Sequence, residues 1–379
     1  MHLAIAGIAL FGAHAGAQTG VIRRVEVPAP SLHGNLIGDP VARRVSIYLP
    51  ERYFTHPRQR FPVIYLLHGF AADDRAFIAG AYQNLNVRVS MDSLIGAGKV
   101  EPMIVVTPNA RNRFDGSFYT NSVTTGRWED FIAKDLVGYI DRHFRTIRSA
   151  TGRGLAGHSM GGYGALHVGM RNPGVFSAIY ALSPCCLSNS VLEPKGAMQT
   201  AWRRALSVTD TSQIKAAGFF PNILMALSAA YSPAPNRRPL YIDYPIAIRG
   251  DSQVRISAVA ARWKPPLTMI DQHQANLRRL TIGFDAGASD GLSDIPVNVR
   301  ALDSALTRLG IPHLAEVYEG GHGNRIRERL ERVVFPFFSQ YLKAASAAGS
   351  RTQRRAIAER GWWRRDSLAH HLCRPRLHT

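Results

Sequence analysis

A serine flanked by glycines, between a short apolar segment and a helix of small residues, constrains the fold of this chain more than any other feature. Residues 157–161 read Gly-His-Ser-Met-Gly and match the pattern G-x-S-x-G. Residues 154–157 predict a strand, and the small residues of 160–170 predict a helix. A strand, a sharp turn and a helix in this order expose a nucleophilic serine above a mostly parallel sheet. Ser159 is therefore the candidate nucleophile.

Short apolar segments alternate with helical patterns along most of the chain. Predicted strands lie at 45–49, 61–67, 103–107, 154–157, 176–182, 280–286 and 313–318. Predicted helices lie at 128–144, 160–170, 295–309 and 325–342. Strands that alternate with helices pair in parallel, and the helices cover both faces of the sheet. The sequence therefore predicts an α/β fold with a mostly parallel central sheet and helices on both faces.

Three regions differ from this alternation. Residues 187–276 are rich in proline and tyrosine, so we expect a cap inserted into a domain that spans 18–343. Residues 344–379 are Arg-rich without hydrophobic periodicity, which predicts a basic, disordered tail. Residues 1–17 hold an apolar run and an A-x-A sequence, which predict a signal peptide and export to the periplasm or the cell exterior. A buried N-terminal segment is the alternative, because no basic residue precedes the run. No later run is long enough for an integral membrane span.

The chain carries a formal charge of +19, and 40 of its 46 basic residues are arginines. Such a charge raises the alternative of a non-catalytic protein whose basic tail binds nucleic acid or anionic lipid, with an affinity that falls steeply as salt rises. Codon bias toward arginine explains the charge as well. Because the candidate catalytic residues favour an enzyme, we expect no nucleic-acid partner.

The cysteines and the glycine-rich motifs predict no disulfide scaffold, no metal site and no cofactor site. Cys185 and Cys186 are adjacent, which disfavours a bond between them, and we expect small buried thiols, with a pairing of one to Cys373 left open. Cys373 follows two histidines but lacks a fourth metal ligand. Residues 152–157 fit G-x-G-x-x-G, but these glycines straddle the strand and no carboxylate follows at the distance that dinucleotide binding requires.

A serine nucleophile needs a base, and the base needs a carboxylate that orients it. His322 lies in the glycine-rich segment 320–323 that follows one predicted strand, and Asp290 lies in the loop that follows another. The carboxyl ends of parallel strands meet at one edge of the sheet, where such folds place their sites. Asp290 is therefore the candidate acid and His322 the candidate base, whereas Asp285 belongs to the strand itself.

A second G-x-S-x-G match covers residues 287–291, but a loop rather than a helix follows it, so Ser289 is disfavoured. The oxyanion of an acyl-transfer reaction needs backbone N–H donors held in place. The strand 61–67 leads into His68-Gly69-Phe70, and this turn can present the N–H of Phe70 beside that of Met160. We expect His68 to support the turn through a hydrogen bond.

The ordered set of motifs resembles the esterase D-like group of α/β-hydrolases, which includes S-formylglutathione hydrolases, feruloyl and enterochelin esterases and mycolyltransferases. It comprises the HGF turn after VIYLL, the WEDF helix, GHSMGGYGAL, the G-x-x-D loop and the GGH turn. The resemblance spans about residues 40–345 apart from the cap. It implies the α/β-hydrolase fold, with Ser159 as nucleophile, Asp290 as acid, His322 as base, and Phe70 and Met160 as oxyanion donors. Asn324 stands where the group often has an aromatic residue, and the cap is longer than in compact members.

The sequence thus predicts an exported serine carboxylesterase that needs no metal or cofactor and acts on a small-molecule or carbohydrate ester. The first alternative is an acyltransferase of the mycolyltransferase type, which passes the acyl group to an alcohol. An S-formylglutathione-type thioesterase is a further alternative, which export disfavours. The acyl and alcohol parts of the substrate and the oligomeric state stay open.

Overall fold

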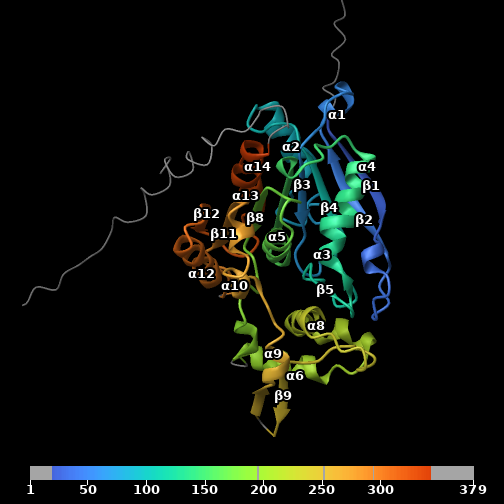
Figure 1. The fold of residues 1–379 in the computed structure, drawn as a ribbon, viewed down its shortest axis with the longest axis vertical. Helices are drawn as coiled ribbons and strands as arrows, with labels where there is room; N and C mark the ends of the chain where they lie inside the picture. The colour runs from blue at the N-terminus through green and yellow to red at the C-terminus, as the bar shows by residue number, and fades with distance from the viewer. Residues whose placement is uncertain (1–18, 194–195, 251, 293, 343–379) are drawn as a thin grey trace, which may run out of the picture.

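Eight strands form one central sheet in the order β1-β2-β4-β3-β7-β8-β11-β12 (Figure 1). The computed structural model describes residues 19–193, 196–250, 252–292 and 294–342. The strands are β1 (Val21–Pro28), β2 (Ala42–Leu49), β3 (Val63–Leu67), β4 (Ile104–Pro108), β7 (Arg153–His158), β8 (Ala178–Leu182), β11 (Thr281–Gly287) and β12 (His313–Tyr318). Only β2 pairs antiparallel with its neighbours, and the other pairs are parallel. The predicted mostly parallel sheet is therefore confirmed.

The sequence of β3 shows how both faces of the sheet are buried. Val63, Tyr65 and Leu67 belong to one core cluster, and Ile64 and Leu66 belong to the other. Successive side chains of a strand point to opposite faces, so an uninterrupted apolar run is suited to a strand covered on both sides.

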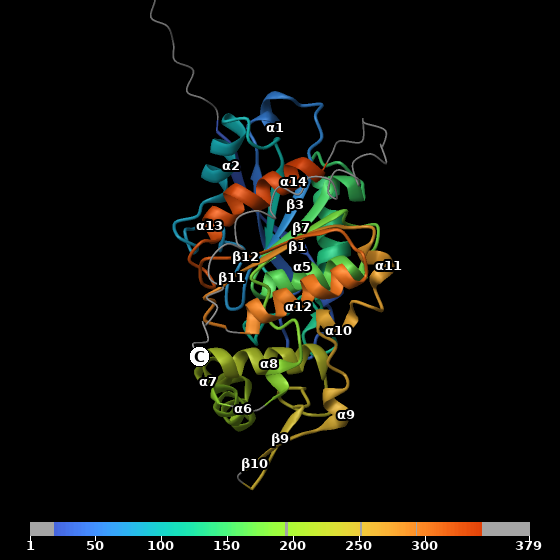
Figure 2. The same ribbon diagram turned by 90° about the vertical axis from the view of Figure 1, so that its left-hand side faces the viewer.

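Helices cover the two faces (Figure 2). One core cluster draws on α2 (Val87–Gly96), α13 (Ile326–Arg329) and α14 (Phe335–Tyr341). The other draws on α3 (Trp128–Asp130), α4 (Val137–His143), α5 (Met160–Arg171) and α12 (Asp294–Arg308). The central sheet and the helices named above do not include α1 (Arg52–Thr55). The two-residue strands β5 (Asn121–Ser122) and β6 (Gly126–Arg127) pair with each other in a separate small sheet.

The structure differs from the predicted elements in a few places. Strand β1 was not predicted, because this mostly exposed edge strand carries three charged residues, Arg23, Arg24 and Glu26, in place of a continuous apolar run. The predicted helices 128–144 and 325–342 each contain a π-helical stretch, at Phe131–Leu136 and Leu330–Val334. The second stretch ends just before Pro336, which has no backbone N–H to donate to the preceding helical turn and so interrupts the regular α-helical bonding there.

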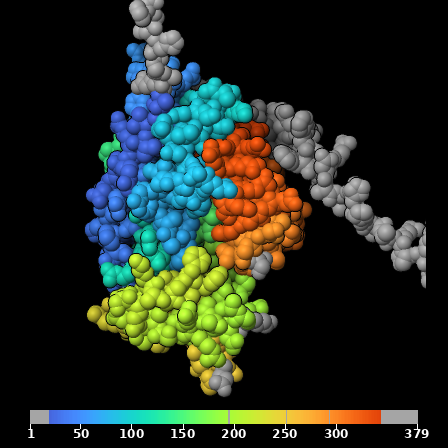
Figure 3. Space-filling model, turned by 180° about the vertical axis from the view of Figure 1, so that it is seen from behind, coloured from blue at the N-terminus to red at the C-terminus, as the bar shows by residue number. Residues whose placement is uncertain are grey.

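The chain between β8 and β11 forms most of a lobe below the sheet (Figure 1, Figure 3). The lobe contains α6 (Ala197–Ser207), α7 (Ile214–Ala217), α8 (Phe219–Tyr231), β9 (Ile246–Arg249), β10 (Ser252–Arg255) and α9 (Ser257–Ala260). The same segment of chain continues into α10 (Pro266–Met269) and α11 (Gln274–Leu277), which lie beside α12 and α5 of the main domain (Figure 2). The buried Trp202 of α6 contacts Trp263 and Tyr244, with ring centroids 6.4 and 6.3 Å away. These aromatic residues belong to or pack against the same core cluster as one face of the central sheet, so the lobe packs continuously on the main domain.

The predicted signal peptide (1–17) and the predicted basic tail (344–379), with Cys373 and the neighbouring histidines, lie outside the described residues. Within the described ranges, no helix is both long and apolar enough to cross a membrane. Cys185 and Cys186, which are described, are buried free thiols, as expected.

Candidate active site

Ser159 occupies a sharp turn between β7 and α5. Its backbone dihedral angles, φ +57° and ψ −117°, lie outside the regions that residues other than glycine ordinarily adopt. The two flanking glycines permit this turn. A Cβ on Gly157 would stand 2.3 Å from the Gly161 carbonyl oxygen, and one on Gly161 would stand 2.0 Å from the Leu67 carbonyl oxygen. A side chain at either position would therefore overlap neighbouring backbone atoms, which explains why both flanking residues of the G-x-S-x-G pattern are glycine.

Ser159, His322 and Asp290 form a continuous hydrogen-bonded line. His322 Nε2 lies 2.9 Å from Ser159 Oγ, and His322 Nδ1 lies 2.8 Å from Asp290 Oδ2. The Asp290 side chain is fully buried, whereas the His322 side chain is 28% exposed. A carboxylate can only accept, so Nδ1 carries the proton and Nε2 is free to accept one from the serine. The structure brings together the three residues that the sequence singled out.

Asp285, the other candidate carboxylate, faces a different set of groups. Its buried Oδ2 accepts hydrogen bonds from Tyr180 Oη (3.0 Å) and Arg329 Nε (2.9 Å). Arg329 also forms an ion pair with Glu316. Asp285 is therefore part of a buried polar cluster in the strand layer, as its position in the predicted strand indicated.

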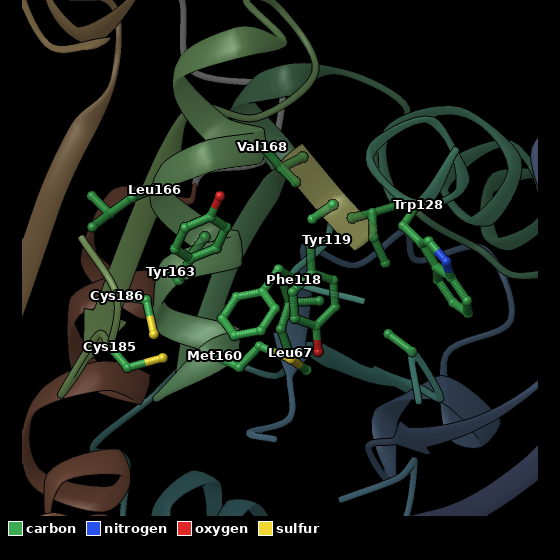
Figure 4. Packing of buried hydrophobic residues seen from close by; sticks show 14 of the residues in the cluster. Leu67, Phe118, Tyr119, Trp128, Met160, Tyr163, Leu166, Val168, Cys185 and Cys186 are labelled. Atoms are coloured by element: carbon green, nitrogen blue, oxygen red, sulfur yellow. The ribbon is translucent and has the colours of Figure 1, made fainter. Parts of the chain in front are cut away.

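The turn His68-Gly69-Phe70 lies directly against Ser159. A Cβ on Gly69 would stand 3.5 Å from Ser159 Cβ. Met160 is the first residue of α5, so its N–H is among the donors that a helix leaves without an internal partner. Its side chain packs in the core cluster that also holds Phe118 and Leu67 (Figure 4). The turn and the helix start are thus adjacent at the serine, where the sequence places the oxyanion donors Phe70 and Met160.

His68 supports this turn through two hydrogen bonds, as expected. Its Nε2 accepts from the Ala110 N–H at 2.9 Å, and its Nδ1 lies 2.8 Å from the Gly69 carbonyl oxygen, to which it donates. Burial lowers the pKa of His68 to about 4, so the ring is neutral at neutral pH. His68 holds the turn and does not face Ser159.

A mostly apolar cavity of about 280 Å³ opens above Ser159. Its wall combines residues of the main domain with residues of the lobe below the sheet: Phe70, Cys185, Cys186, Val191, Met198, Phe219, Phe220, Ile223, Leu224 and Leu292. Phe70 contacts Phe219 edge to face, with centroids 5.6 Å apart. Two carboxylates, Glu193 and Asp294, also line the cavity.

Three features of the site were not predicted from the sequence. Asp294 accepts hydrogen bonds from Ser190 Oγ (3.1 Å) and Asn298 Nδ2 (3.3 Å), and burial raises its pKa. His158 contacts the backbone of the histidine loop, and Tyr82 contacts His158. No local pattern marks these residues, because their neighbours come from distant parts of the chain.

Comparison with known proteins gives matches at three levels. The family model described as a putative esterase matches residues 40–326. Esterase Rv1288 of Mycobacterium tuberculosis is 34% identical over 140 residues, which are 35% of this chain and 27% of that protein. An endo-1,4-beta-xylanase/feruloyl esterase of Xylanibacter ruminicola is 32% identical over 136 residues, 35% of this chain and 18% of the other. The matched segment therefore covers only a minor part of these relatives.

Solved structures resemble the whole described fold. A ferulic acid esterase superposes with a TM-score of 0.57 at 22% identity, covering 85% of this chain and 99% of the other. An S-formylglutathione hydrolase of Staphylococcus aureus gives a TM-score of 0.53 at 15% identity, with 86% and 100% covered. These likenesses confirm the α/β-hydrolase fold. Because the family match covers most of the chain, including the serine turn and both loops that carry Asp290 and His322, the chain belongs to the putative esterase family.

Proposed function

We propose that this protein is a serine carboxylesterase that acts through Ser159, His322 and Asp290. The observation that carries the proposal is the hydrogen-bonded line from Asp290 Oδ2 through His322 to Ser159 Oγ, with distances of 2.8 and 2.9 Å. Ser159 lies at the floor of a cavity with room for a small ester. Membership in the putative esterase family supports the same chemistry.

In the proposed first step, Ser159 Oγ attacks the ester carbonyl carbon while His322 Nε2 takes the serine proton. Asp290 holds the Nδ1 proton and stabilises the imidazolium that forms. The N–H groups of Phe70 and Met160 stabilise the negative charge on the carbonyl oxygen. His322 then gives its proton to the leaving alcohol, and the acyl group stays on Ser159.

In the second step, His322 removes a proton from water, and the resulting hydroxide attacks the acyl-enzyme. The acid leaves, and Ser159 regains its proton from His322. If an alcohol takes the place of water, the same intermediate gives acyl transfer. The two outcomes differ only in the acceptor, so hydrolysis is the proposed reaction and transfer the alternative.

The cavity favours an uncharged ester with an apolar or aromatic part. Phe70, Phe219 and Phe220 offer aromatic surface beside the serine. A glutathione thioester carries two carboxylates of its own, and the carboxylate of Asp294 would repel them in a cavity of low polarity. The charge of the cavity therefore opposes the S-formylglutathione alternative, as the predicted export does.

A substrate panel with active-site labelling tests the proposal. We expect a fluorophosphonate to label Ser159, and uncharged aromatic or feruloyl sugar esters to be hydrolysed faster than S-formylglutathione. Adding glycerol as acceptor separates hydrolysis from transfer, because transfer yields a glycerol ester. Absence of turnover on every ester, with labelling elsewhere than Ser159, contradicts the proposal.

A further inference from the structure

His158, the residue before the candidate nucleophile, forms a direct hydrogen bond to the main chain of the candidate base. His158 Nε2 lies 2.7 Å from the His322 carbonyl oxygen, although 164 residues separate them in the sequence. The two imidazole rings also contact each other, with centroids 4.7 Å apart. His158 is 3% exposed, so the bond is shielded from water. The serine turn and the histidine loop are thus joined by a second connection besides the Ser159–His322 bond.

The partners of His158 determine which of its ring nitrogens carries the proton. A carbonyl oxygen only accepts, so Nε2 must donate to His322. In a neutral ring Nδ1 is then an acceptor, and the Tyr82 hydroxyl lies 3.3 Å from it. Burial and the neighbouring His322 lower the pKa of His158 to about 3. The ring is therefore neutral, and Tyr82 favours the tautomer that donates to the loop.

The histidine loop needs such a contact, because glycines precede and follow His322. Gly320, Gly321 and Gly323 give the backbone more freedom than other residues would. Asp290 fixes the His322 ring through Nδ1, but the position of the ring also depends on the main chain that carries it. Ser289 N–H donates to the Gly320 carbonyl at 2.9 Å, which anchors the start of the loop but not His322 itself.

We infer that His158 is a positioning residue that holds the His322 main chain, and so keeps His322 Nε2 in contact with Ser159 Oγ. This inference rests on the proposed function. The hydrogen bonds of His158 go to the His322 main chain and to Tyr82 rather than to Ser159 Oγ or the His322 ring, and His158 exchanges no proton with substrate. Its contribution is to restrict the loop, since a displacement of about 1 Å in a catalytic group can reduce a rate by about 100-fold.

Two amide substitutions at His158 test whether the hydrogen bond to the His322 carbonyl matters, because both are polar but only one can form that bond. In His158→Gln the amide nitrogen can reach the place of the histidine Nε2 and donate to the His322 carbonyl. In His158→Asn the amide is one methylene shorter and cannot reach it. We expect His158→Asn to lower kcat on p-nitrophenyl acetate by about 10- to 100-fold with KM within about twofold of wild type. His158→Gln should recover most of this loss.

Circular dichroism and thermal unfolding establish that each variant is folded. If His158→Asn is folded and keeps the wild-type kcat, or if folded His158→Gln is as slow as His158→Asn, the inference is overturned. If His158→Asn does not fold, His158→Gln should still keep most of the wild-type kcat, and Tyr82→Phe is measured beside it. Tyr82→Phe removes a hydroxyl that contacts His158 Nδ1 and also bonds the backbone of Gly69. We expect a loss of about threefold to tenfold in kcat with KM unchanged in this variant. A wild-type kcat in Tyr82→Phe overturns the inference.

Ser159→Ala distinguishes a failure of this inference from a failure of the proposed function. If Ser159→Ala keeps its activity, the proposed function fails. If Ser159→Ala is inactive while folded His158→Asn is fully active, the esterase proposal stands and only the role of His158 is wrong.

Discussion

His322 Nε2 lies 2.9 Å from Ser159 Oγ across a separation of 163 residues in the sequence. Ser159 follows β7 and His322 follows β12, and two strands, β8 and β11, lie between these in the sheet. The histidine loop therefore reaches over the ends of both. Gly287 at the end of β11 allows this, because a Cβ there would stand 2.3 Å from the Gly320 carbonyl oxygen. The close approach of the histidine loop to the end of β11 therefore depends on glycine at position 287.

The two candidate carboxylates should separate into one catalytic and one structural residue. Asp290→Asn should lower kcat by about three to four orders of magnitude with KM little changed, because the amide no longer holds the Nδ1 proton of His322. Asp285→Asn removes one of the two carboxylates that pair with the buried Arg329 and leaves Glu316 as the other. It should lower the free energy of unfolding by about 3 kcal/mol and leave kcat of the folded protein near wild type.

Steady-state kinetics and urea unfolding of the two variants, measured side by side, check this assignment. A low kcat in Asp285→Asn together with an active Asp290→Asn would mean that the roles are reversed.

His68 should make the protein less stable in acid. Its pKa is about 4 in the folded protein because of burial, compared with about 6.5 for an unperturbed histidine. Between these values the unfolded chain binds a proton that the folded protein does not. Stability is therefore fully present above about pH 6.5 and is lost as pH falls toward 4, by roughly 1.4 kcal/mol per pH unit.

In His68→Gln this contribution is removed, while the amide oxygen can still accept from Ala110. The slope of unfolding free energy against pH, from urea titrations at pH 7, 6 and 5, should be smaller in the variant than in wild type. The difference isolates His68 from every other titrating group. Equal slopes in both proteins would argue that His68 is not held neutral.

Asp294 should select against anionic substrates. Asp294→Asn removes a negative charge from the cavity wall and should raise kcat/KM for an ester with an anionic acyl group by about tenfold relative to a neutral ester of the same size. Ser190→Ala is the matched control, because it removes a hydrogen bond to Asp294 and leaves the charge. The prediction is wrong if the kcat/KM for the anionic ester divided by the kcat/KM for the neutral ester is the same in Asp294→Asn and wild type.

The sequence predicts the residues that follow strand ends but not the contacts between distant loops. Ser159, Asp290 and His322 were found because a buried parallel strand is an apolar run and its carboxyl end marks the edge where sites form. Asp285 could be distinguished from Asp290 because it alternates with the other residues of its strand.

The parts that were missed depend on tertiary structure. His158 holds a backbone carbonyl 164 residues away, and no local periodicity encodes that contact. The helix α8, which brings Phe219 and Phe220 to the cavity, was not predicted as a separate element, because residues 187–276 were interpreted as a proline-rich cap without regular elements. Pro221 lies in the first turn of this helix, where it is tolerated.

The central claim is that Ser159 is the nucleophile, and ester turnover by Ser159→Ala tests it most directly. Ser289→Ala is the matched control, because Ser289 lies in the second G-x-S-x-G match and anchors the histidine loop through its backbone N–H rather than its side chain. We expect Ser159→Ala to fold like wild type and to lose ester hydrolysis by several orders of magnitude in kcat, while Ser289→Ala keeps nearly the wild-type kcat. Robust turnover by purified Ser159→Ala, or an inactive but folded Ser289→Ala, would contradict the account.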